Sequence, residues 1–423
     1  STCPCVLFND APTTETYTRS LHDALPISAL GYSSFCVRPV NESCRKERFL
    51  LVDGLKAENE FLQLQLAQDG TLTITDKASG EVYPDLNVLI DGGDFGDEYQ
   101  YRAPRKDTLV DSRGACKRLS LVALGPASVT YCLEYDLELP RSSNIESRDE
   151  LTIGCPVRCE VSLYSGLPRV DVRTFIDNRA RDHRLRACFR TGAATKESFA
   201  LGQYDVVTLP IGNPPEWGRI PSDPSRAQYG WCAATDGVRG LMVASKGLCE
   251  YELYDDAGRS LAITLLRCTG ALARLGAAGE GEILDDGGQC IGDYEFEYSL
   301  LPFSGDWAPT AAEADAFLAP PLALHTAQGA GTSPSSKSWL VLEPCPLLLT
   351  AVKQAEDGSG DLVVRLFNPL PTAVQASLGL GKNISTVRLA ALDETPGEGR
   401  AITEKAVTLD AASKQIVTLR LTC

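Results

Sequence analysis

Residues Tyr131–Leu139 read YCLEYDLEL, a stretch in which apolar and acidic side chains alternate. Successive side chains of a β-strand point to opposite faces of the sheet. The Tyr and Leu side chains therefore share one face, and Glu134, Asp136 and Glu138 occupy the other. A strand with one apolar and one polar face is typical of an antiparallel sheet that packs on one side only. The stretch predicts a half-buried strand of a β-sandwich or barrel.

The same alternation returns along most of the chain, in the runs 60–66, 71–75, 158–164, 169–176 and 294–300. The pair Asp69-Gly70, which lies between the first two runs, predicts a β-hairpin with a type I′ turn. Helical periodicity is nearly absent. The short stretch Ala311–Leu318 is followed by Pro320 and Pro321, which end a helix. We therefore expect an all-β protein.

The overall charge limits the classes of partner. The chain of 423 residues carries a formal net charge of -16. Nucleic acids and anionic membrane surfaces attract basic patches, so neither is an expected partner. The sequence contains no apolar run of about 18 residues, the length that a membrane span requires. Because no signal peptide is recognisable either, we expect a cytoplasmic protein without a membrane span.

Fifteen cysteines are scattered along the chain, an odd number that does not resemble the framework of a short secreted domain. Cys132 and Cys159 lie in strand-like runs, where a free thiol packs as a small hydrophobe. Cys155 and Cys159 are separated by three residues, but no second close pair lies nearby, which disfavours a zinc site. We expect reduced, structural cysteines.

The distribution of small residues predicts the domain organisation. Residues 326–338, TAQGAGTSPSSKS, are rich in Ser, Gly, Thr and Ala and show no hydrophobic period. We expect a linker over residues 319–338, which separates a large β-sandwich at 58–318 from a small one at 339–423. Lead-in strands are expected at 29–57.

The first residues are set apart from this organisation. Residues Cys5–Ser28, CVLFNDAPTTETYTRSLHDALPIS, resemble the translation of a sequencing adapter. The only methionine is Met242, and the chain begins at Ser1. We therefore set residues 1–28 aside as an adapter-like artefact. We also expect that the natural start of the protein is missing.

A series of motifs carries a family resemblance. The large region contains ENEFLQLQLAQDGTLTITDK (58–77), DGGDFGDEYQY (91–101), SGLPRVDVRTFIDNRARDHRL (165–185), KGLCEY (246–251) and LAITLLR (261–267). The tail adds AEDG (355–358), RLFNP (365–369) and QIVTLRL (415–421). In order and spacing these motifs resemble the C-terminal region of bacterial glycoside hydrolase family 38, the α-mannosidases and mannosylglycerate hydrolases.

The resemblance implies both a fold and an activity. Family members combine an α/β barrel, a helical bundle and β-sandwich domains, so we expect a galactose-mutarotase-like β-supersandwich followed by a small C-terminal β-sandwich. The family hydrolyses terminal α-mannosyl residues with retention, which requires two carboxylates about 5 Å apart. It also uses a zinc ion that two His and two Asp residues of the barrel hold.

The catalytic end of that pattern is not found in this sequence. Of the three histidines, His22, His183 and His325, only His183 lies inside the resembling large region. We therefore assign no catalytic residue and no metal ligand to this chain. We expect the zinc of the intact enzyme to be bound by a missing N-terminal catalytic barrel, and the chain alone to be inactive.

The loop Asp91–Tyr101 contains the candidate substrate-binding residues. Its three glycines permit tight turns, and acceptors and aromatic rings crowd between them. Carboxylates and hydroxyls bond to sugar hydroxyls, and aromatic faces stack on pyranose rings. The candidates are Asp94, Asp97, Tyr99 and Tyr101. The alternative is a loop that only caps strands or docks on the barrel.

Other functions stay open. All-β sandwiches also serve as stand-alone carbohydrate-binding or interaction modules. A mutarotase-like epimerase would need a positioned acid and base, for which His183 is the only histidine in the large region. A mannoside or glycan is the expected ligand, and assembly into a homo-oligomer is left open.

Overall fold

The computed structural model describes residues 5–6, 30–37, 50–213, 223–274, 282–324, 334–343, 347–381 and 384–422. Most of the adapter-like segment, together with His22 and His325, lies outside these residues. Contacts divide the chain into two compact units: the larger comprises 47–202 and 207–319, and the smaller comprises 1–46, 203–206 and 320–423. No helix in the described ranges is long and apolar enough to cross a membrane.

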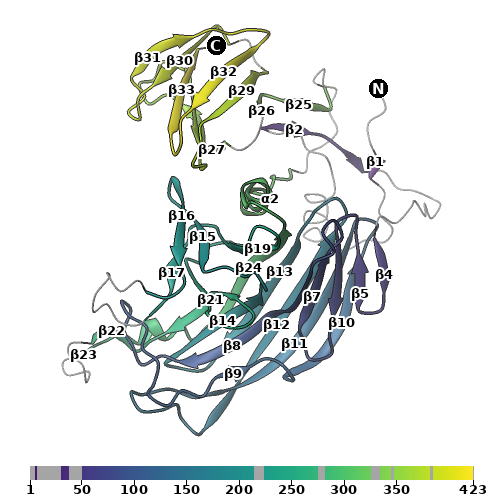
Figure 1. The fold of residues 1–423 in the computed structure, drawn as a ribbon, viewed down its shortest axis with the longest axis vertical. Helices are drawn as coiled ribbons and strands as arrows, with labels where there is room; N and C mark the ends of the chain where they lie inside the picture. Colours follow the sequence, from purple (N-terminus) through teal and green to yellow (C-terminus); the bar gives the residue numbers. More distant parts are fainter. Residues whose placement is uncertain are drawn as a thin grey trace. The chain divides into compact units, whose positions relative to one another are not determined.

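Two sheets form the larger unit (Figure 1). The first has nine strands in the spatial order β10 (Cys116–Leu124), β11 (Ser128–Pro140), β12 (Thr152–Tyr164), β13 (Val170–Asn178), β24 (Gly292–Phe303), β19 (Gly240–Ser245), β18 (Trp231–Thr235), β15 (Glu197–Gly202) and β16 (Asp205–Pro210). The long strands β11, β12, β13 and β24 pair antiparallel in continuous register. This sheet supplies one face of the core.

The second sheet has ten strands. Their order is β17 (Arg226–Ala227), β20 (Glu250–Leu253), β21 (Ser260–Cys268), β14 (His183–Arg190), β8 (Val82–Gly93), β7 (Leu72–Asp76), β6 (Leu62–Leu66), β5 (Lys56–Glu58) and β4 (Leu51–Asp53), and β9 (Val110–Asp111) pairs with β8. Strands β4 and β5, which come from the expected lead-in region, are therefore part of this sheet.

The apolar faces of the two sheets pack against each other. Along β11, Tyr131, Leu133 and Leu139 have no exposed surface, whereas Glu138 on the opposite face is exposed. They share one core with side chains of the second sheet such as Leu64. Burial of each large apolar side chain stabilises the fold by about 1.5–3 kcal/mol, so the alternation decides which face points inward. The predicted all-β class, a large sandwich followed by a small one, is confirmed.

The hairpin between β6 and β7 forms where it was predicted, but with another turn. A type I′ turn needs positive φ at both central residues. Only Gly70 has one, at φ 90°, whereas Asp69 does not. The N–H of Gly70 bonds to the carbonyl oxygen of Ala67, and the N–H of Ala67 bonds to that of Thr71. The turn is therefore a longer loop that ends in a left-handed glycine, and the type I′ prediction is wrong.

The described residues of the large unit also form one α-helix. Helix α2 (Ala308–Leu318) begins three residues before the expected stretch, with Pro309 in its first turn, and ends just before Pro320, as predicted. Its buried face, formed by Ala311, Ala314 and Phe317, contacts β19 and β24. Short elements complete the unit: β22 (Ala271–Arg274), β23 (Glu282–Leu284) and the 3₁₀ helix η2 (Asp286–Gln289).

The small unit is a second sandwich. One sheet contains β26 (Leu340–Glu343), β29 (Val374–Leu380) and β32 (Ala406–Ala411), and the other contains β27 (Leu348–Gln354), β28 (Leu362–Phe367), β33 (Ile416–Thr422), β30 (Thr386–Ala390) and β31 (Pro396–Arg400). Leu378, Val407 and Leu419 form its core. Two small pairs accompany it, β1 (Cys5–Val6) with β3 (Cys36–Val37) and β2 (Gly31–Ser33) with β25 (Ser336–Ser338).

Candidate functional site

Three strand ends meet at one end of the ten-stranded sheet. Gly93, the last residue of β8, lies opposite His183, the first residue of β14. His183 in turn lies opposite Cys268, the last residue of β21. The chain segments that join or adjoin these ends are rich in polar side chains. We call them the polar end, defined by residues 91–102, 178–184, 267–271 and 285–290.

A buried ionic network supports the polar end. Oδ2 of Asp91 lies 2.5 Å from Nδ1 of His183, and Oδ1 accepts a hydrogen bond from the guanidinium of Arg148. All three side chains are buried. Arg148 also donates to the carbonyl oxygens of Asp91 and Thr108, at 3.2 and 3.1 Å. The carboxylate of Asp91 is thus held between Arg148 and His183.

Hydrogen bonds engage both ring nitrogens of His183. Nε2 lies 3.0 Å from Oδ1 of Asn178. That atom is the amide oxygen, because Nδ2 of Asn178 donates to the carbonyl oxygens of Gln289 and Cys290 at 3.3 and 2.8 Å. Both ring nitrogens are therefore engaged by neighbouring side-chain oxygens. No nitrogen of His183 is left free to act as a general base. A mutarotase-like epimerase could therefore not use His183 as its base.

Asp94 anchors the loop that follows β8. It is fully buried, and its Oδ1 accepts hydrogen bonds from the N–H groups of Gly96 and Arg102 at 2.8 and 3.1 Å. Its Oδ2 accepts from Nε of Arg267 at 2.9 Å. Arg267 also donates to two carbonyl oxygens of the same loop. Burial raises the pKa of Asp94, and Arg267 and the two N–H donors oppose that rise.

Asp97 closes the turn of the same loop. Its Oδ1 accepts from the N–H groups of Tyr99 and Gln100 at 3.0 and 2.9 Å, and its Oδ2 from that of Arg274 at 2.9 Å. Burial opposes the charged form, but these three donors outweigh it and lower the pKa of Asp97. The turn also requires Gly96, because a Cβ there would lie 1.9 Å from the carbonyl oxygen of Gln100. Both carboxylates of the loop are thus engaged in holding its backbone.

The two tyrosines of the loop differ in exposure. Tyr99 is 77% exposed, whereas Tyr101 is partly buried beneath Arg184, whose Cζ lies 3.3 Å from the centre of the ring. Burial raises the pKa of the Tyr101 hydroxyl. The structure therefore brings all four candidate residues into one loop, but only Tyr99 presents its side chain to solvent. Gly92 and Gly93, which were expected in the turns of this loop, lie within strand β8.

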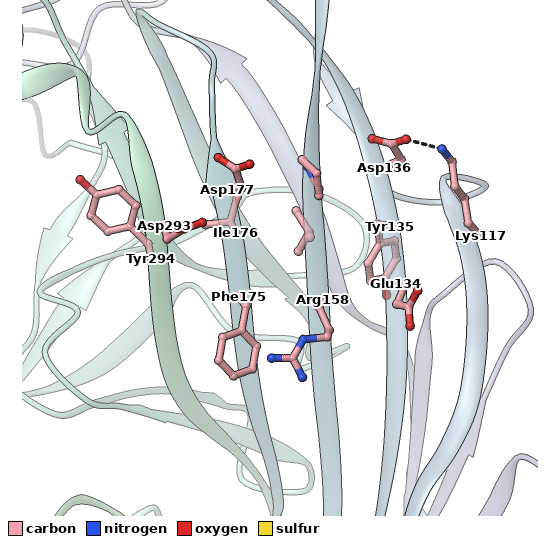
Figure 2. A pocket seen from close by; sticks show the side chains of 12 residues that line it. Lys117, Glu134, Tyr135, Asp136, Arg158, Phe175, Ile176, Asp177, Asp293 and Tyr294 are labelled. Carbon is pink, nitrogen blue, oxygen red and sulfur yellow. Dashed lines mark hydrogen bonds and ion pairs between the residues drawn. The ribbon is translucent and has the colours of Figure 1, made fainter.

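A shallow groove of about 520 Å³ lies on the other sheet of the large unit. It is lined by Lys117, Glu134, Tyr135, Asp136, Pro156, Val157, Arg158, Phe175, Ile176, Asp177, Asp293 and Tyr294 (Figure 2). Five of its charged side chains form ion pairs, among them Lys117 with Asp136. The guanidinium of Arg158 lies 3.9 Å from the centre of the Phe175 ring and covers it. The groove therefore offers less free hydrogen-bonding capacity than its composition suggests.

The described residues do not fit the metal site that the resemblance implies. Zinc sites in proteins use clustered His, Cys and carboxylate ligands. Among the residues that the structure describes, no group of three or more His, Cys, Asp or Glu side chains could hold a metal ion. Both nitrogens of His183 are already bonded. We derive no metal-dependent step from this chain.

Comparison with known proteins identifies both units. The family model described as "Glycosyl hydrolases family 38 C-terminal domain" matches residues 57–270, about half of the chain. The model described as "Glycosyl hydrolases family 38 C-terminal beta sandwich domain" matches residues 347–419. The first match covers the polar end up to Gly270, and the second covers most of the small sandwich.

Individual relatives agree with these matches. A protein of Halalkalibacterium halodurans named "Putative mannosylglycerate hydrolase" is 28% identical over 361 residues, which are 80% of this chain and 39% of that protein. The crystal structure of an α-mannosidase from Enterococcus faecalis V583 is 25% identical with a TM-score of 0.79, over 91% of this chain and 44% of that one. A family 38 glycosyl hydrolase structure from Enterococcus faecalis gives the same identity and TM-score, over 90% and 46%.

The chain spans less than half the length of these relatives. The chain therefore belongs to glycosyl hydrolase family 38, of which it carries the C-terminal region.

Proposed function

We propose that this chain supplies the C-terminal β domains of an α-mannosidase-type glycoside hydrolase, and that its loop 94–102 contacts the sugar through Tyr99. The observation that carries the proposal is an exposed aromatic ring on a loop whose backbone is held at several points. The names of two relatives, an α-mannosidase and a mannosylglycerate hydrolase, support a mannosyl substrate.

Rigidity is the physical argument for this loop. Asp94 and Asp97 accept six backbone and guanidinium hydrogen bonds, by which they fix the segment that carries Tyr99. A ring that is already positioned loses little conformational entropy when a pyranose stacks on it. In this proposal Tyr99 contacts the sugar, and Asp94, Asp97 and Tyr101 act as positioning residues. Any direct bond from Asp97 to a hydroxyl uses a remaining lone pair of its carboxylate.

The cleavage step itself is not assigned to this chain. Retaining hydrolysis needs one carboxylate as nucleophile and another as acid and base, about 5 Å apart. At the polar end the buried carboxylates of Asp91 and Asp94 are bonded to cations, and neither has exposed surface. We propose that the nucleophile, the acid and the zinc ion belong to a catalytic domain with which these β domains form one enzyme in the cytoplasm.

A binding titration tests the role of Tyr99. Methyl α-mannoside and a short α-mannoside are titrated into the chain by isothermal calorimetry or NMR, with Tyr99→Ala and Tyr229→Ala as a matched pair. Tyr229 is a second exposed tyrosine, 67% exposed, on another loop. Loss of an aromatic contact worth about 0.5–1.5 kcal/mol raises Kd roughly 2- to 12-fold. We expect this rise for Tyr99→Ala alone. Equal affinities of both variants and the unchanged chain would refute the contact.

A second candidate function is sugar binding by the sandwich alone, as in a carbohydrate-binding module. The groove beside Phe175 favours it, because its volume lies within the range of small-molecule sites. In the same titration, Phe175→Ala would then weaken binding and Tyr99→Ala would not. The opposite pattern supports the first proposal.

A further inference from the structure

Two cysteine thiols lie together beneath the loop that carries Tyr99. Cys268 is the last residue of β21 and is fully buried, and Cys290 follows η2 and is partly exposed. Both are free thiols, and the sulfur of Cys290 lies 3.9 Å from the carbonyl oxygen of Arg267, the residue before Cys268. They are 22 residues apart in sequence, so only the fold brings them together.

The backbone holds the two thiols in place. The N–H of Thr269 bonds to the carbonyl oxygen of Gly288 at 3.0 Å, and the N–H of Asp285 bonds to that of Gly270 at 3.1 Å. Gly288 is required for this approach, because a Cβ there would lie 2.7 Å from the carbonyl oxygen of Thr269. The segment that ends in Cys290 is therefore fixed alongside the residues that follow Cys268.

The surroundings distinguish the two sulfur atoms. The neighbouring Cys268 thiol lowers the pKa of Cys290, helped by the Tyr294 hydroxyl and the nearby charge of His183 and opposed by burial. The same pairing, together with burial, raises the pKa of Cys268. Nδ2 of Asn178 lies 3.5 Å from the sulfur of Cys268. Of the two, the partly exposed Cys290 is therefore the thiol that ionises more readily, and Cys268 is the buried partner.

We propose that Cys268 and Cys290 are a redox-sensitive thiol pair that small-molecule disulfides convert into an intramolecular disulfide. The Cys290 thiolate attacks one sulfur of the disulfide, whose S–S bond breaks and releases one thiolate. The Cys268 sulfur then attacks Cys290, its proton passes to the second leaving thiolate, and the new bond forms. Two protein thiols are oxidised, one small disulfide is reduced to two thiols, and no other reactant is consumed.

A disulfide between Cys268 and Cys290 would affect the loop 94–102. Arg267, which holds Asp94 and two loop carbonyl oxygens, directly precedes Cys268. The N–H of Glu98 bonds to the carbonyl oxygen of Ala271 at 3.2 Å. A covalent link between Cys268 and Cys290 would therefore restrain the segment to which the loop is bound. The inference concerns these thiols only and does not depend on the sugar-binding proposal.

Peptide mapping tests the pair in the full chain. Reduced protein is incubated with oxidised glutathione at neutral pH, free thiols are alkylated, and the digest is analysed by mass spectrometry. We expect a linked Cys268–Cys290 peptide two hydrogens lighter than its reduced parts, and equal loss of alkylation at both residues. The exposed Cys249 serves as an internal control that takes up only a single glutathione.

Two variants test the order in which the two thiols react. In Cys268→Ser, Cys290 should accumulate as a mixed disulfide with glutathione, because the resolving thiol is absent. In Cys290→Ser, Cys268 should stay unmodified, because it is buried. The proposal is overturned if the unchanged chain gives only a mixed disulfide at Cys290, if either cysteine stays fully alkylated, or if Cys290 links to a different cysteine. All three results are measured on the unchanged chain, so the test remains decisive even if a variant folds poorly.

Discussion

Nδ1 of His183 lies 2.5 Å from Oδ2 of Asp91, and neither side chain has exposed surface. Arg148 binds the other carboxylate oxygen, so one buried carboxylate compensates the buried charge of Arg148 and also bonds to His183. Removal of one partner from a buried ion pair typically costs about 3–5 kcal/mol, because the remaining charge is left without compensation. The network at the base of the polar end should therefore be a main determinant of stability in the large unit.

Asp91→Asn tests this network. The substitution keeps the shape of the side chain but removes the negative charge, so we expect the free energy of unfolding to fall by about 3–5 kcal/mol. The control is Glu146→Gln, which breaks the exposed pair of Arg105 and Glu146 and should cost less than about 1 kcal/mol. Urea denaturation measures both. Equal losses in the two variants would show that the buried network has no special role.

Arg267→Lys tests the anchor of the loop. A lysine keeps the charge but lacks the planar group of donors that reaches Asp94 and two carbonyl oxygens together. We expect faster hydrogen–deuterium exchange of amides in residues 94–102 and unchanged exchange in β11. Unchanged exchange in the loop would mean that Asp94 and Asp97 hold it without Arg267.

Asp315→Asn tests a pH dependence in helix α2. Burial raises the pKa of Asp315 to about 6, from an ordinary value near 3.9. Between these values the folded chain keeps a proton that the unfolded chain loses, so the stability due to this group falls as pH rises from about 4 to 6. At pH 7 we expect the variant to be more stable by about 2–3 kcal/mol, and at pH 3.5 the two proteins should match.

The control for this pH dependence is Asp236→Asn. Burial opposes the charged form of Asp236, but backbone N–H groups of Arg239, Ala194 and Val238 outweigh it and lower the pKa of the carboxyl. That variant should lose stability at pH 7 instead of gaining it. Stability curves over pH 3.5–7 measure both variants, and a gain in both would contradict the assignment to burial of Asp315.

Much of the fold follows from local pattern. The stretch Tyr131–Leu139 lies within β11 and Ala311–Leu318 lies within α2, because alternation and proline act on neighbouring residues. The turn at Asp69-Gly70 was mispredicted because loop length, and not the dipeptide alone, selects the turn type. Local pattern thus locates elements well, but it gives their detailed geometry less reliably.

The polar end could be predicted only in part. The loop residues were recognisable because they are adjacent in sequence, but the partner of Asp94 is Arg267, 173 residues away. The partner of Asp91 is His183, 92 residues away. Cys290, which follows η2, interacts with Cys268. Without these distant partners the sequence could not show that Asp94 and Asp97 hold the loop backbone, or that two of the fifteen cysteines form a pair.

The central claim is that these β domains belong to a mannosidase-type enzyme but do not perform the cleavage themselves. Hydrolysis of p-nitrophenyl α-mannoside by the expressed chain, with and without added zinc, tests it most directly, with an intact family 38 relative as the control. We predict no turnover above the buffer rate while the relative is active. Zinc-dependent turnover by the chain alone would contradict the claim and would place the catalytic residues within these 423 residues.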